Sequence, residues 1–191
     1  MLAKEQMFEK EAGKMTTYLI DGDNRPGKQL DGIELLTAED KIHIFYAEKN
    51  TYYSSEKRQK EVQSRTSANI TYTRIKQGKN AVDFAISIAA AECAMESYNE
   101  RIFLVSADGH FDLIFDILTK RFGNECTIKR IAQIWEGAIL APNCVDSWTK
   151  AQLLLEQVLG AEGGLLFKQI RALCKENEQP KTLWQKIFAR I

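Results

Sequence analysis

The sequence predicts an α/β protein with a doubly wound, mostly parallel five-stranded sheet and a small helical appendage at its C-terminus. Short apolar segments alternate with helical patterns over residues 16–131, and such alternation favours a parallel sheet. The segment Arg101–Ser106 is apolar enough to be buried on both faces, as central parallel strands are. After Pro142 no strand pattern recurs, and the remaining segments read as helices.

Five strands are expected, and each ends at polar or turn-forming residues. The first stops at the turn residues 21–24, and the third alternates apolar and polar side chains. The expected strands are Thr16–Ile20, Ile42–Ala47, Asn69–Ile75, Arg101–Ser106 and Glu125–Ile131.

Helices are expected in the connections between these strands. Residues 25–41 form a loop with a short helix near residues 32–36, and residues 54–66 form a polar helix capped by a serine. An alanine-rich helix is expected over residues 81–97, after a break at residues 78–80. A further helix is expected over residues 108–122.

The chain is expected to divide into an extension at 1–14, an α/β domain at 15–144 and a helical appendage at 145–191. Within the appendage, helices are expected at 148–159, 165–176 and 181–191, with a turn at 160–164. Apolar faces on these helices predict a surface that closes a homodimer, binds a protein partner or packs against the sheet domain.

Composition is that of an ordinary soluble globular protein, with 45% apolar and 27% charged residues in a chain of 191. Residues 1–14 lack the apolar core of a signal peptide, and no apolar run approaches the roughly 18 residues that span a bilayer. The four cysteines form no CxxC pair, which argues against a zinc site. We therefore expect a cytoplasmic protein with no membrane segment.

Charge is unevenly distributed although the formal net charge is zero. Residues 49–80 hold eight basic and two acidic residues, whereas residues 1–48 hold six basic and ten acidic residues. An acidic site beside a basic segment suits a metal-dependent phosphodiesterase, because the basic residues bind phosphates and the acids bind the metal. A solvated charged helix is the alternative interpretation of the basic segment.

Four aspartates are expected to converge at one edge of the sheet. Asp21 directly follows the first strand, and Asp108 follows the fourth. Ligands of doubly wound sheets bind beyond the carboxyl ends of the strands. Asp112 lies one helical turn after Asp108, and Asp83 lies in the first turn of the alanine-rich helix.

Converging carboxylates repel one another unless a cation neutralises them. Oxygen ligands with retained water suit Mg²⁺ or Mn²⁺, which would support phosphodiester cleavage. Each acid also has an ordinary explanation by itself, such as ending a strand or capping a helix.

Four segments together resemble a PIN-like nuclease domain, and most closely its NYN-type branch. They occur in the order and spacing of that family over about residues 16–135, namely LIDGDN (19–24), IFYAEKN (44–50), IKQGKNAVDFAI (75–86) and FLVSADGHFDLIFDIL (103–118). The resemblance implies the strand order 3-2-1-4-5 and a metal-dependent endoribonuclease acting on single-stranded or structured RNA. It implies 5′-phosphate and 3′-hydroxyl products.

The resemblance also assigns roles to single residues. The implied Mg²⁺ or Mn²⁺ ligands and catalytic residues are Asp21, Asp83, Asp108 and Asp112. Asn24 is expected to orient the first acid, and Ser106 to contact phosphate or support an acid. Glu48 is the nearest match to a further family acid, in an imperfect position.

Several positions depart from the family pattern or have only a general role. Asp23 stands where related domains often carry Glu, and His110 lies between two expected ligands. Tyr52 and Tyr53 could stack on a base, although tyrosines at such positions are more often packing residues. The expected contacts to the RNA backbone are Lys49, Arg58, Lys76 and Lys79.

Two other functions fit part of the sequence. A haloacid-dehalogenase-type phosphatase would use the DGD segment at 21–23 as its nucleophile pair, but Arg25 then departs from its motif and Asp83 has no role. A non-catalytic PIN-like module would bind RNA or a protein partner instead.

Overall fold

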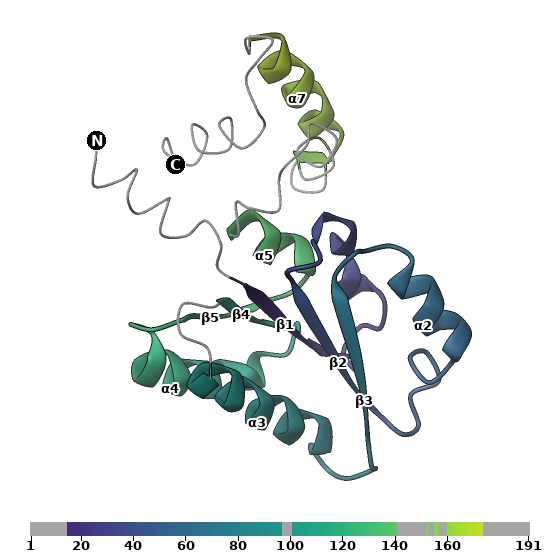
Figure 1. The fold of residues 1–191 in the computed structure, drawn as a ribbon, viewed down its shortest axis with the longest axis vertical. Helices are drawn as coiled ribbons and strands as arrows, with labels where there is room; N and C mark the ends of the chain where they lie inside the picture. The colour runs from purple at the N-terminus through teal and green to yellow at the C-terminus, as the bar shows by residue number, and fades with distance from the viewer. Residues whose placement is uncertain (1–14, 97–100, 141–151, 153–154, 157–159, 174–191) are drawn as a thin grey trace. The chain divides into compact units, whose positions relative to one another are not determined.

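A parallel five-stranded sheet organises the computed structural model, which describes residues 15–96, 101–140, 152, 155–156 and 160–173 (Figure 1). The strand order is β3-β2-β1-β4-β5, and every neighbouring pair is parallel. The predicted fold class and strand order are therefore confirmed. The strands are β1 (Thr16–Asp21), β2 (Lys41–Ala47), β3 (Asn69–Ile75), β4 (Arg101–Val105) and β5 (Thr127–Ile131).

Helices cover both faces of this sheet, as a doubly wound fold requires. Figure 1 shows α3 and α4 side by side on one face and α2 on the other. The bounds are η1 (Lys28–Leu30), η2 (Ile33–Leu35), α2 (Glu56–Gln63), α3 (Ala81–Glu96), η3 (Gly109–Phe111), α4 (Asp112–Phe122) and α5 (Ile134–Leu140).

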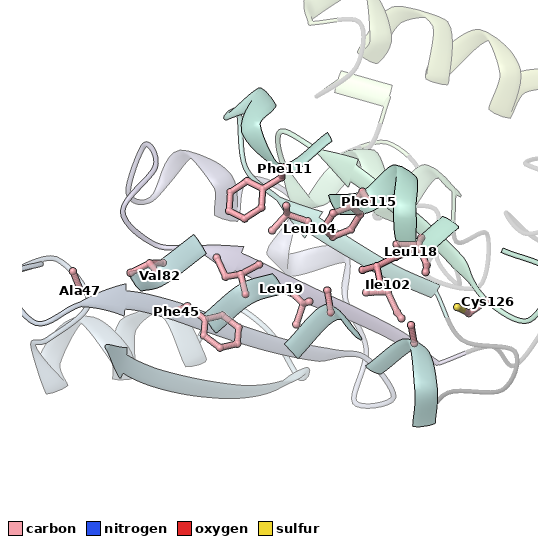
Figure 2. Packing of buried hydrophobic residues seen from close by; sticks show 14 residues of the cluster. Leu19, Phe45, Ala47, Val82, Ile102, Leu104, Phe111, Phe115, Leu118 and Cys126 are labelled. Atoms are coloured by element: carbon pink, nitrogen blue, oxygen red, sulfur yellow. The ribbon is translucent and has the colours of Figure 1, made fainter. Parts of the chain in front are cut away.

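The core that positions the site lies between the sheet and the pair α3 and α4. Side chains of alternate strand residues, such as Leu19, Ile102 and Leu104, are fully buried on this face (Figure 2). The buried row of α3 has a spacing of four residues, and its last members, Ala90 and Ala94, are small. Small side chains let the helix lie close to the strands, which places its first turn at the carboxyl edge of the sheet.

The register of the strands brings distant residues together at that edge. Ile20 of β1 pairs with Val105 of β4, so Asp21 and Ser106 each follow paired positions. On the other side of β1, Asp21 pairs with Phe45 of β2. Parallel neighbours end at the same edge of a sheet, and the turns after β1, β2 and β4 therefore meet there.

The structure differs from the sequence expectation in two helical regions. The helix expected over residues 108–122 is divided, because Asp108 caps the short helix η3 and α4 begins only at Asp112. Helix α5 (Ile134–Leu140) was not expected at all. Gly137 within this helix lies so close to Tyr18 and Phe103 that a Cβ atom would meet them within 3 Å.

The turn expected at residues 160–164 is wrong, because α7 (Ala161–Leu173) is already helical from residue 161. Only Gly160 has the positive φ of a turn residue, at 60°. Gly163 lies against the backbone oxygen of Leu155, where a Cβ atom would clash. Glycine at 163 therefore permits close packing of two segments instead of breaking the helix.

The α/β unit comprises Lys14–Gly137, and α7 belongs to a second compact unit. The expected extension 1–14 and the helix 181–191 lie outside the described residues, as does most of the helix expected at 148–159. The domain limits 15–144 and 145–191 stay a prediction. No helix within the described ranges has the length and apolar character to cross a membrane.

Candidate active site

A cleft of about 510 Å³ opens at the carboxyl edge of the sheet. Its walls come from the turns that follow β1, β2, β3 and β4 and from the first turn of α3. Four carboxylates and three lysines line it, namely Asp21, Asp23, Asp83, Asp108, Lys49, Lys76 and Lys79. The cleft thus holds acidic and basic side chains within one cavity.

Asp21 is the last residue of β1 and is 5% exposed. Its Oδ2 atom accepts a hydrogen bond from the hydroxyl of Ser106 at 2.9 Å, and its Oδ1 atom accepts one from the backbone N–H of Asp23 at 3.3 Å. Burial raises the pKa of the Asp21 carboxyl, and the negative charges of Asp83 and Asp23 raise it further. A positive charge in the cleft would favour the ionised form.

Ser106 connects the first acid to Asp108. Its side chain is fully buried, and its oxygen accepts the backbone N–H of Asp108 at 3.1 Å while its hydroxyl donates to Asp21. Ser106 therefore bonds the carboxylate of Asp21 and the backbone of Asp108, and its role in the site stays a prediction.

Asp108 caps the short helix η3. Its Oδ1 atom accepts the backbone N–H of His110 at 2.9 Å and lies 2.9 Å from Nδ1 of the same residue. The backbone N–H bond lowers the pKa of Asp108 below its usual value, and the side chain of His110 adds to the effect. These bonds therefore favour the ionised form of Asp108.

Asp83 reaches the cleft from the first turn of α3. The chain enters this helix through Asn80, whose φ of 56° makes the sharp turn. Burial raises the pKa of the Asp83 carboxyl, and the charges of Asp108 and Asp23 raise it further. Asp21, Asp23, Asp83 and Asp108 therefore repel one another across the cleft.

Asp23 is a fourth acid of the cleft that the sequence analysis did not assign to the site. Its Oδ1 atom accepts the side-chain N–H of Asn50 at 2.7 Å and the backbone N–H of Ala47 at 3.2 Å. Asn50 also donates to the backbone oxygen of Gly22 at 2.9 Å. The feature of the sequence that could have indicated Asp23 as a site residue is its position two residues after Asp21 in the same turn.

Asn24 has a different partner from the one expected. Its side-chain oxygen accepts the backbone N–H of Ala107 at 3.2 Å, so it ties the turn after β1 to the turn after β4. The side chain of Asp21 is oriented by Ser106 and the backbone of Asp23 instead.

Asp112, expected with the other acids, is not among the residues that line the cleft. Its carboxylate forms a bidentate ion pair with Arg130, in which Nη2 lies 3.1 Å from Oδ2. This guanidinium lowers the pKa of Asp112 and also donates to the backbone oxygen of Ser106 at 3.1 Å. The sequence does not indicate this role of Arg130, because its partner Asp112 is 18 residues away on another element.

Three of the four basic residues expected at the RNA backbone line the cleft, namely Lys49, Lys76 and Lys79. The fourth, Arg58, lies 4.5 Å from the ring centroid of Tyr52 and pairs with Glu61 at 2.8 Å. Its charge is therefore engaged on α2 and away from the cleft.

Two other expected contacts lie away from the cleft. Glu48 is exposed and is not among the residues that line the cleft. Its backbone N–H donates to the backbone oxygen of Ile75 at 2.9 Å. Tyr53 is fully buried, and its hydroxyl accepts the backbone N–H of Gly27 at 3.3 Å. Burial makes Tyr53 a packing residue, which was the alternative to stacking on a base.

The donors of the cleft suit a hard divalent cation in their chemistry. They are carboxylate oxygens, and two of the four carboxyls have pKa values raised partly by neighbouring negative charge. Among the described residues, however, no three His, Cys, Asp or Glu side chains form a ready-made metal-binding group. A cation that keeps several waters and uses one or two carboxylates, as Mg²⁺ commonly does, is compatible with this arrangement.

Comparisons with known proteins connect this cleft to a family. A family model described as PIN domain matches residues 15–129, a range that includes every acid lining the cleft. No curated protein matches the chain. A crystal structure of a protein of unknown function from Vibrio parahaemolyticus is similar, with 17% identity and a TM-score of 0.41 over 63% of this chain and 83% of that one.

Proposed function

The chain belongs to the PIN domain family, and on that premise we propose that it is a divalent-metal-dependent endoribonuclease. It hydrolyses phosphodiester bonds of RNA and leaves 5′-phosphate and 3′-hydroxyl ends. The observation that carries this proposal is the single cleft in which four carboxylates face three lysines. Such a cavity binds a cation and a polyanion at the same time.

Asp21, Asp83 and Asp108 are the proposed ligands of Mg²⁺ or Mn²⁺, and Asp23 lies close enough to share its charge. When bound, the ion supplies a Lewis acid that polarises the phosphate and lowers the pKa of a water molecule. It would also neutralise the repulsion among the four carboxylates.

The protein's own residues bind and orient the substrate in this proposal. Lys49, Lys76 and Lys79 pair with backbone phosphates on one wall of the cleft. Ser106 keeps the carboxylate of Asp21 in one orientation through its 2.9 Å hydrogen bond. His110 is 93% exposed beside Asp108, where it would meet a phosphate entering from solvent.

Other expected site residues have weaker support. Asp112 would have to leave Arg130 before it could bind a metal. Glu48 and Arg58 lie outside the cleft and would contact only a longer RNA. The DGDN turn and the SADGHFD segment support membership of the NYN-type branch, which stays part of the proposal.

The test is cleavage of an end-labelled RNA by wild type and by Asp108→Asn in Mn²⁺ or Mg²⁺. We expect internal cuts by the wild type and a loss of at least about 100-fold in the variant, since an acid of the cleft is neutralised. Asp116→Asn is the matched control, because Asp116 is an exposed acid of α4 outside the cleft. Enzymatic removal or addition of terminal phosphates on the cleaved fragments shows whether they carry 5′-phosphate and 3′-hydroxyl ends.

Each other result points to a named alternative. Equal cutting by wild type and Asp108→Asn contradicts the proposal. RNA binding without cutting by either protein supports the non-catalytic binding module. The absence of a ready-made metal-binding group among the described residues also favours that module. Phosphate release from a small ester such as p-nitrophenyl phosphate, without RNA cuts, supports the phosphatase.

A further inference from the structure

The outer surfaces of α3 and α4 expose large apolar side chains side by side. Phe84, Ile88 and Met95 of α3 are 60–66% exposed, and Leu113 and Ile117 of α4 are 69% and 56% exposed. Their spacing puts each set on one helix face, opposite the buried rows. The two helices contact each other and lie side by side (Figure 1), and we treat their five exposed residues as one surface, called here the outer α3–α4 face.

The size of this face is at the upper end of what a monomer ordinarily exposes. Five large side chains at this exposure present on the order of 600 Å² of apolar surface, which is the upper limit of the largest patch on typical monomers. A stable interface buries about 800 Å² per partner, including a polar rim. The face is therefore close in area to one half of a dimer interface.

The charged residues at one end of the face are complementary to each other. Both helices run from the carboxyl edge of the sheet toward the opposite edge, so they are roughly parallel. At the far end, α3 carries Glu92 and Glu96, whereas α4 carries Lys120 and Arg121. Acids at the C-terminal end of α3 are unfavourable beside its dipole, and α3 has no basic residue in its last turn.

We propose that a second copy of this chain covers the outer α3–α4 face, with α3 of each copy packed on α4 of the other. A two-fold axis parallel to the helices produces this arrangement, and every contact then occurs twice. Phe84 and Ile88 meet the Leu113–Ile117 row of the partner. Glu92 of one copy meets Lys120 of the other, because each continues its apolar row by one further turn.

The arrangement would place the interface beside the cleft. Asp83 points to the cleft from α3, and the next residue, Phe84, belongs to the outer face. The proposal does not depend on nuclease activity, because it follows from exposure and charge alone.

Sedimentation equilibrium of the full chain tests the proposal, and the wild type is expected to dimerise. Glu92→Lys and Lys120→Glu should each raise the dimer dissociation constant at least about tenfold, since like charges then meet twice per dimer. The double variant should restore the wild-type value. These positions are exposed, so the substitutions leave the fold intact.

Ile88→Asp should also dissociate the dimer, whereas Leu165→Asp should leave it unchanged. Leu165 is the matched control, because it is 61% exposed on α7 of the other unit. A monomeric wild type, or a dimer that survives Ile88→Asp, overturns the proposal. Dissociation by Leu165→Asp alone overturns it in favour of the C-terminal helices, and a double charge variant that stays monomeric overturns the proposed axis.

Discussion

Asp21 and Asp108 follow neighbouring strands, yet their carboxyl groups titrate in opposite directions. Burial raises the pKa of Asp21, whereas the backbone N–H of His110 lowers the pKa of the exposed Asp108. At the level of single residues, the cleft therefore combines one carboxyl whose pKa is lowered with two whose pKa values are raised by burial and by repulsion from neighbouring acids. Binding of a cation relieves that repulsion, which gives the site a physical preference for a metal.

Asp83→Asn should stabilise the protein at neutral pH when divalent ions are absent. The folded-state pKa of Asp83 is raised above 3.8, so its favourable contribution is fully present below pH 3.8 and is lost as the pH rises through the folded pKa. At pH 7 the wild type carries the repulsive charge and the variant does not. Thermal unfolding at pH 7 and pH 4 measures this, and an equal effect at both pH values would contradict it.

Asp108→Asn should weaken Mn²⁺ binding far more than Asp112→Asn does. Asp108 lines the cleft, whereas Asp112 is held by Arg130 outside it. Isothermal titration calorimetry of both variants gives the comparison, with Asp116→Asn as a control. A larger loss in Asp112→Asn would show that its carboxylate leaves Arg130 to bind the ion, as the family resemblance implied.

The turn after β1 requires glycine at position 22, because the backbone of β2 lies very close to it. The backbone N–H of Gly22 donates to the oxygen of Phe45 at 2.8 Å, which holds the turn against β2. A Cβ atom on Gly22 would lie 2.6 Å from that oxygen. At the level of elements, this close approach brings Asp21 and Asp23 to the edge where the other strands end.

Gly22→Ala should destabilise the protein by about 1–3 kcal/mol, because β1 and β2 must separate to admit the methyl group. Gly109→Ala is the control, since its Cβ atom would have an ordinary contact of 3.7 Å with Asp112. Urea unfolding monitored by circular dichroism compares the two variants. Equal stability of both would show that the turn after β1 adjusts freely.

Across the whole α/β unit, a chain with no net charge concentrates opposite charges around one cavity. Acids from β1, the turn after it, α3 and the turn after β4 line this cavity together with lysines from the segments after β2 and β3. Only the folded state gathers these groups, so a ligand of the cleft must stabilise folding.

Mn²⁺ should therefore raise the melting temperature of the full chain. At a concentration 100-fold above the dissociation constant, the expected stabilisation is about 2.7 kcal/mol, or roughly 5–10 °C for a protein of this size. Differential scanning calorimetry with Mn²⁺ and with EDTA measures the effect. Asp108→Asn should lose most of it, and an unchanged melting temperature of the wild type would contradict metal binding.

The pattern of apolar residues was enough to predict the strands, because central parallel strands are buried on both faces and therefore consist of nearly continuous apolar residues. It placed β3 (Asn69–Ile75) at its observed bounds and the other strands within two residues. It also placed Asp21 and Asp108 at strand ends, since position after a strand is a local property. The prediction of a turn at residues 160–164 was wrong because the glycines were interpreted as a helix break, whereas Gly163 lies within a helix and allows close contact with Leu155.

By itself, the sequence determined the fold class, the strand order implied by family resemblance, and the acids that end strands and begin helices. Only the tertiary structure decided which charges share the cleft. It brought in Asp23 through Ala47 and Asn50, and it paired Asp112 with Arg130 outside the cleft. The physical reason is that a strand end is encoded by neighbouring residues, whereas an ion pair depends on how separate elements pack.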